Sequence, residues 1–219
     1  MIPILYSNTS NPKSLVTDTT TGLGRLDECI SAVVTEERNG AYELEIEYPV
    51  NGVLFPQITC ASWIKAKPFV DGDVQLFRVY SISKPVNGIC TINAEHVSYM
   101  LTHALVLTGT DNTNPQSMFI ADVFDTIESR ASDIDPRYVY NGAWSFHFYW
   151  AKSASAQYFI MDKIRSIREW LLGSDYSILT VYGDGEYKFD NFDVYLYDAD
   201  GGDHARGHDN GVKIQYGKN

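Results

Sequence analysis

The chain has 219 residues, 44% of them hydrophobic, which is ordinary for a globular protein with a sizeable core. Its 28 acidic and 17 basic residues give a net charge of −11, which repels phosphate and argues against tight nucleic-acid binding. The three cysteines, Cys29, Cys60 and Cys90, form no CxxC spacing, so reduced core thiols are expected in place of disulfides or zinc. The sequence shows neither a signal-peptide pattern nor a membrane-span-length apolar stretch, so a protein made in the cytoplasm is expected.

Short β-strands are predicted over the N-terminal part of the chain. The clearest one is Tyr42–Tyr48, where Tyr, Leu, Ile and Tyr alternate with three glutamates, the pattern of a half-buried strand. It follows Asn39-Gly40, a strong hairpin-turn signal, and a second such turn is expected near Asn87-Gly88. Short strands at this spacing indicate an antiparallel barrel or sandwich. The strands expected here cover residues 2–6, 28–36, 42–48, 63–67, 75–83 and 88–94.

Helices and strands are mixed after Glu95. A short helix is expected over His96–Leu105, and a second helix follows the start signal Asn114-Pro115. One face of the second helix is expected to hold Phe119, Val123, Ile127 and Ala131.

The clearest helical pattern lies further along, at Ser155–Leu172, with Gly173 as its C-cap. Its expected apolar stripe is Ile160, Ile164, Ile167 and Leu171. The remaining segments are expected to be strands, of which the second and third form a hairpin: Trp144–Trp150, Ile178–Tyr182, Glu186–Phe189, Asp193–Tyr197 and Val212–Tyr216.

This order of elements predicts the α+β class with an interrupted first domain. We expect an antiparallel β-barrel or sandwich domain over residues 1–105 and an inserted mixed α/β domain over residues 106–192. The strands within residues 193–219 are expected to return to the first β domain.

Potential metal ligands are densest in the loop 198–209. His204 and His208 lie four residues apart, with Asp203 and Asp209 beside them, a spacing that could chelate a metal on a helix. Three glycines in the loop argue against a helix, and the EF-hand pattern fails for lack of a glutamate at its last position. A polar hairpin loop is the better interpretation, so no metal or cofactor is expected.

No nucleophile, base and orienting group stand in a recognisable catalytic spacing. His96 is therefore interpreted as a residue that starts a helix or forms a hydrogen bond in the core. Two other functions stay open at this point. One is a cell-wall hydrolase that uses the 198–209 loop. The other is a carbohydrate-binding adhesin, motivated by the aromatic residues Trp144, Phe146, Phe148, Tyr149 and Trp150.

Three blocks of sequence resemble one family. The first is Val34–Pro49, VTEERNGAYELEIEYP. The second joins Gln75–Pro85, QLFRVYSISKP, to AEHVSY at 94–99. The third comprises LG at 172–173, YGDGEYKFDN at 182–191, RG at 206–207 and IQYGKN at 214–219. In this order they resemble the phage minor structural or anti-receptor tail proteins, also called tail-associated lysins or prophage endopeptidase tail proteins.

The resemblance implies a fold like the baseplate hub protein of contractile tails, with a tube-type β domain interrupted by an inserted domain. It implies a homotrimer at the tail tip of the virion, docked on the hexameric distal tail protein, with the tape measure protein as a further partner. DNA would pass such a hub without specific binding, and no membrane contact is implied. Family members continue well past the YGKN motif, so we expect this chain to be an N-terminal segment. Any lysin or receptor-binding module would follow it, and the chain itself is not expected to be an enzyme.

Overall fold

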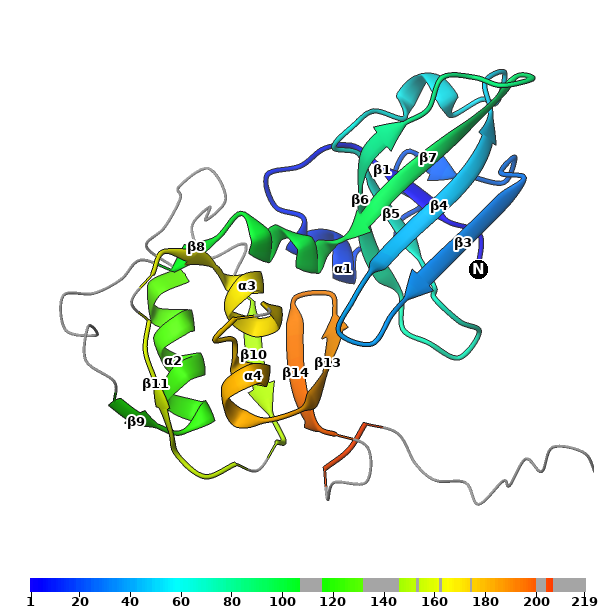
Figure 1. Cartoon of the computed structure of the whole chain (residues 1–219). Helices are drawn as coiled ribbons and strands as arrows, with labels where there is room; N and C mark the ends of the chain where they lie inside the picture. The colour runs from blue at the N-terminus through cyan, green and yellow to red at the C-terminus, as the bar shows by residue number, and fades with distance from the viewer. Residues whose placement is uncertain are drawn as a thin grey trace, which may run out of the picture.

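The computed structural model describes residues 1–106, 116–131, 146–152, 154–161, 163–173, 175–199 and 204–206. Its largest element is a curled antiparallel sheet of seven strands, drawn at the upper right of Figure 1. A short N-terminal helix, α1 (Lys13–Thr17), and a 3-10 turn, η1 (Phe55–Gln57), lie in its connections. In spatial order the strands are β2 (Gly24–Arg25), β1 (Ile4–Tyr6), β5 (Trp63–Ala66), β6 (Gln75–Ile82), β7 (Ile89–His96), β4 (Tyr42–Pro49) and β3 (Ser31–Glu36).

A smaller unit follows, reached through the 3-10 helix η2 (Val97–Thr102) (Figure 1). Its sheet has three strands in the order β10 (His147–Trp150), β14 (Asp193–Asp198) and β13 (Gly185–Asp190). The helices beside this sheet are α2 (Ile120–Ala131), α3 (Ile167–Leu172) and α4 (Ile178–Tyr182). Two short strand pairs complete the unit: β9 (Gln116–Met118) with β11 (Gln157–Phe159), and β8 (Leu105–Val106) with β12 (Arg165–Ser166). This mostly β architecture with a few helices is compatible with the predicted α+β class.

Strand β4 has the predicted register. Tyr42, Leu44, Ile46 and Tyr48 are buried on one face, and Glu45 is exposed on the other. The neighbouring strands match this alternation, because Ala94 and Ile92 of β7 lie opposite Leu44 and Ile46 and are buried as well. A period of two therefore holds across the centre of the large sheet.

The two units share a hydrophobic core. One contiguous cluster of buried side chains contains Leu44 and Phe77 of the large sheet together with Phe124, Trp170 and Leu196 of the smaller unit. Apolar burial of this kind resists separation of the units, because pulling them apart would return that surface to water. No helix in the described ranges combines the length and apolar character needed to cross a lipid bilayer.

The predicted helix over Ser155–Leu172 is wrong for most of its length. Residues 157–159 form β11, which pairs with β9, and the helix begins only at Ile167. Ile164 is 59% exposed, whereas Ile167 and Leu171 are buried as predicted. The start is set by a capping box, in which the side chains of Ser166 and Glu169 each bond to the other's backbone N–H.

Two further predictions for the smaller unit are wrong. Ile178–Tyr182 forms helix α4, because the Ser177 hydroxyl caps its first turn by accepting a bond from the Thr180 N–H. The strand expected at Asp193–Tyr197 exists as β14, but it bonds to β10 and β13 and does not return to the large sheet. The other strand expected to return, Val212–Tyr216, lies outside the described residues, as does the start signal Asn114-Pro115.

Three smaller differences concern Phe119, the helix after His96 and the cysteines. Phe119 precedes α2 and is 58% exposed, while Val123 and Ile127 of the predicted face are buried. The segment after His96 is a 3-10 helix and ends at Thr102. Of the three cysteines, only Cys90 is a fully buried thiol, because Cys60 is exposed and Cys29 is half-buried.

Candidate functional site

The structure describes only part of the loop 198–209, whose potential metal ligands were weighed against a polar hairpin loop. The His204 backbone N–H donates a bond of 3.2 Å to the Asp198 carboxylate, and its side chain is exposed. The other three candidates, Asp203, His208 and Asp209, lie outside the described residues. In the ranges that the structure describes, no three His, Cys, Asp or Glu side chains gather as a metal site would require.

His96 lies at the centre of a buried polar network between the two units. Its Nδ1 accepts a bond of 3.2 Å from the Ser98 N–H, so the proton of the neutral ring belongs on Nε2. From there Nε2 donates to the Gln75 Oε1 at 3.1 Å, while the Tyr42 ring stacks on the imidazole at 4.2 Å between centroids. Burial lowers the pKa of His96 to about 3, because the imidazolium would lose its water shell. The ring is therefore a neutral structural group at neutral pH.

Gln75 and Asn191 extend this network into the smaller sheet. The Gln75 Oε1 also accepts a bond of 2.8 Å from the Asn191 N–H, and its Nε2 donates to the Asp190 carboxylate at 2.9 Å. In return, Asn191 accepts from the Leu76 N–H and donates to the Val74 carbonyl, each at 2.9 Å. Buried polar groups that satisfy one another in this way fix one geometry, because any displacement leaves several of them unpaired.

Two arginines join the units from other sides. The Arg168 guanidinium lies 4.3 Å from the centroid of the Tyr99 ring and donates to the Gly40 carbonyl at 3.0 Å. Arg206 bridges the two sheets directly. Its guanidinium lies 3.0 Å from the carboxylate of Glu186 in β13 and 3.1 Å from the carboxylate of Glu36 in β3. Together with the His96 network, these contacts form a joint that holds the smaller unit in a set position against the large sheet.

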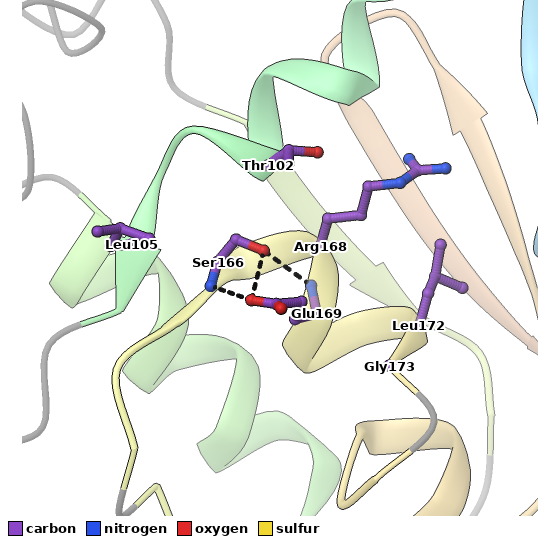
Figure 2. Close-up of a pocket in the computed structure, with 7 residues that line it drawn as sticks. All are labelled: Thr102, Leu105, Ser166, Arg168, Glu169, Leu172 and Gly173. Atoms are coloured by element: carbon purple, nitrogen blue, oxygen red, sulfur yellow. Dashed lines mark hydrogen bonds between the residues drawn. The ribbon is translucent and has the colours of Figure 1, made fainter.

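An open pocket of about 480 Å³ lies between η2 and α3 (Figure 2). Its serine and carboxylate, Ser166 and Glu169, are bonded to each other as the helix cap, at 3.0 Å between Oγ and Oε2. The Arg168 guanidinium points away from this pair, as Figure 2 shows. The lining contains no histidine, and its serine and carboxylate are both engaged in the helix start. The lining residues are Thr102, Leu105, Ser166, Arg168, Glu169, Leu172 and Gly173.

A second cleft, of about 510 Å³, is lined by aromatic side chains of β10 and β14. Tyr149 and Tyr195 stack at 4.8 Å between centroids, and Lys188 lies over Tyr195 at 5.5 Å. The sheet register puts Tyr149 and Lys188 on opposite sides of Tyr195, so both faces of that ring are covered. Tyr149 and Trp150 remain 46% and 40% exposed, and these two rings can contact a ligand.

The aromatic residues singled out from the sequence divide into two groups. Phe148 is buried against Phe124 of α2, and Phe146 packs on Phe192 with 5.1 Å between ring centroids. Both side chains therefore pack inside the protein. Trp144 lies outside the described residues. The sequence did not identify the joint residues Gln75 and Asn191, because a polar residue at a strand end does not indicate which residue it will bond to. The interpretation of His96 as a helix-start and core residue is confirmed.

Comparison with known proteins finds a similar fold among phage tail proteins. No protein-family model matches the chain, and none of the curated proteins matches its sequence. The crystal structure of prophage tail protein gp18 from Listeria monocytogenes EGD-e is similar over 90% of this chain, with a TM-score of 0.60 and 14% identity. The tail protein from Neisseria meningitidis MC58 matches 72% of this chain and 42% of its own, with a TM-score of 0.43 and 7% identity.

The similarity to gp18 shows a shared fold. The shared fold includes both the large sheet and the smaller unit, because the similarity covers 90% of the chain. The chain spans about half of that protein, 51% of its length.

Proposed function

We propose that this chain is a structural component of a bacteriophage tail, the N-terminal segment of a tail-tip hub. The observation that carries the proposal is the fold shared with prophage tail protein gp18 over 90% of the chain. Three sequence blocks support it, since they resemble the tail-tip family in the same order. They are 34–49, then 75–85 with 94–99, then 172–173 with 182–191, 206–207 and 214–219. The rigid joint around His96 and Arg206 suits a component that must keep its shape under load.

In this proposal the large sheet is the tube-type domain of the hub. Three copies would close the distal end of the tube and dock on the hexameric distal tail protein, with the tape measure protein as a further contact. The net charge of −11 would let DNA pass without sticking. Recognition or lysin modules would follow this segment, and the chain itself would not perform catalysis.

Labelling of intact particles tests the proposal. Antibodies raised against this chain should decorate phage particles at the free end of the tail in electron micrographs. Antibodies against the major tail-tube protein provide the control, because they should label the shaft. Label on the capsid, or a protein that is absent from purified particles, would refute the proposal.

The aromatic cleft supports a second candidate function, saccharide binding. Tyr149 exposes aromatic surface beside Tyr195, and Trp150 lines the same cleft while it stacks on Phe124 at 5.6 Å. Aromatic rings of this kind stack on the apolar faces of sugars. A glycan array with the full chain should then give hits that Trp150→Ala abolishes. Tyr158→Ala is the matched control, because Tyr158 is exposed on β11 outside this cleft. An array without hits would remove this function.

A further inference from the structure

Side chains bond to the backbone at both long edges of the small sheet. At the β13 edge, the Asn39 amide donates to the Gly185 carbonyl and accepts from the Tyr187 N–H, each at 2.8 Å. At the β10 edge, the Phe148 N–H donates to the Glu128 carboxylate at 3.1 Å. Natural proteins cover sheet edges in such ways because free backbone groups invite pairing with another chain.

The large sheet ends differently on its two sides. One edge is β2, which has only two residues and offers almost no backbone to pair with. The other edge is β3, with six residues, which pairs with β4 and with no other strand among the described residues. The outer side of β3 is therefore the longest open sheet edge that the structure describes.

The hairpin fixes which groups of β3 point outward. The Glu37 N–H donates to the Ala41 carbonyl at 2.7 Å, so the alternation of an antiparallel ladder directs the backbone groups of Ala32, Val34 and Glu36 away from β4. No residue of the described ranges bonds to these outward groups. They can accept the hydrogen-bond ladder of one added strand.

The sequence of β3 suits strand addition. Its first five residues, SAVVT, contain no proline and no charge, the two features that most often protect an edge. Val33 is 55% exposed at the centre of the strand, and β-branched side chains favour extended pairing.

Charge next to this edge selects the kind of partner. Glu45 of β4 lies directly opposite Val33, is exposed, and has no ion-pair partner among the residues described. An added strand would run about 10 Å from β4, two strand spacings, which a lysine and a glutamate side chain span together. A positive side chain on that strand can thus reach over Val33 to Glu45, whereas a negative one would be repelled.

We propose that the β3 edge binds an extended segment of a partner polypeptide by strand addition, and that this segment carries lysine or arginine at the positions facing Glu45. The inference stands on the sheet edges and charges alone, so it does not depend on a location in a phage tail. Particle labelling and peptide binding can therefore fail independently.

Two synthetic peptides provide the probes, Thr-Val-Lys-Val-Lys-Val-Thr and the same peptide with glutamate in place of lysine. Hydrogen exchange of the full chain should show fast exchange at the amides of Ala32, Val34 and Glu36, and slow exchange once the lysine peptide is added. Glu45→Lys should weaken the lysine peptide about fivefold, the scale of an exposed ion pair, and favour the glutamate peptide. Val34→Pro removes one outward N–H and should abolish binding of both peptides.

Three results would overturn the proposal. The first is slow exchange of the three amides in dilute chain alone, which would mean that the chain itself already covers the edge. The second is protection that rises with chain concentration without peptide, which would identify a second copy as the occupant. The third is equal binding of both peptides to the parent and to Glu45→Lys, which remains informative even if Val34→Pro does not fold.

Discussion

The side-chain amide of Asn39 pairs with the backbone of Tyr187 as a neighbouring strand would. Its carbonyl accepts the Tyr187 N–H, and its NH2 group donates to the carbonyl of Gly185, two residues earlier. Asn39 has a φ of 54°, the left-handed conformation that its hairpin turn requires. One residue therefore closes the turn of the large sheet and the edge of the small one.

Asn39→Gly tests the second of these roles, because glycine keeps the turn conformation and removes the amide. We expect the free energy of unfolding to fall by about 2 kcal/mol, the contribution of two hydrogen bonds. Asn87→Gly is the matched control, since Asn87 has a φ of 52° in another hairpin and lies exposed. Urea unfolding of both variants checks this, and equal losses would show that the amide adds nothing.

Stability should fall with acid because of His96. Its pKa is about 3 in the folded chain and about 6.5 when unfolded, so between these values the unfolded state binds the extra proton. Each pH unit below about 6.5 then costs up to about 1.4 kcal/mol, and the loss ends near the folded pKa.

Urea midpoints at several pH values between 7 and 4 measure this effect. The urea midpoint of His96→Gln should be lower than that of the parent at pH 7 and should change less with pH. His147 is exposed, so the midpoint of His147→Gln should change with pH as steeply as that of the parent. Burial raises the pKa of Glu95, an opposing contribution that all three chains share. Parallel slopes for the parent and His96→Gln would contradict the assignment of a neutral buried imidazole.

Leu44→Asp should abolish cooperative folding of the large sheet. Leu44 is buried at the centre of β4, and an unpaired carboxylate there costs more than about 4 kcal/mol. Glu45→Gln, one position along and exposed, should unfold like the parent. A cooperative thermal transition for Leu44→Asp near that of the parent would show that the register is wrong.

Assembly should depend on the length of the chain. In the hub proposal the full-length protein is a trimer, while the 219-residue chain is a monomer or a weak trimer, because a shorter chain has less surface with which to close a ring. Light scattering on both proteins measures the masses. A stable trimer of the 219-residue chain would place the main contacts in the large sheet or in the smaller unit.

The sequence predicted elements whose pattern is set locally. The alternation from Tyr42 to Tyr48 gave the correct register, because one residue of slip would bury the glutamates. The segment Ile178–Tyr182 was predicted as a strand because a short apolar run has no period that separates strand from helix.

Partners distant in sequence could not be predicted from the same pattern. The alternation in β14 is compatible with either sheet, and only packing decides that it joins β10 and β13. The contacts of the joint could not be predicted for the same reason. Gln75 and Asn191 are 116 residues apart, and nothing in their residue types indicates that they bond to each other.

A reconstruction of the intact tail tip by electron cryomicroscopy would show whether this chain is the tail-tip hub. We expect three copies of the seven-stranded sheet around the tail axis, next to the distal tail protein, each with its smaller unit held at the His96 joint. A tip density that excludes this fold, or the chain found elsewhere in the particle, would contradict the assignment as a tail-tip hub.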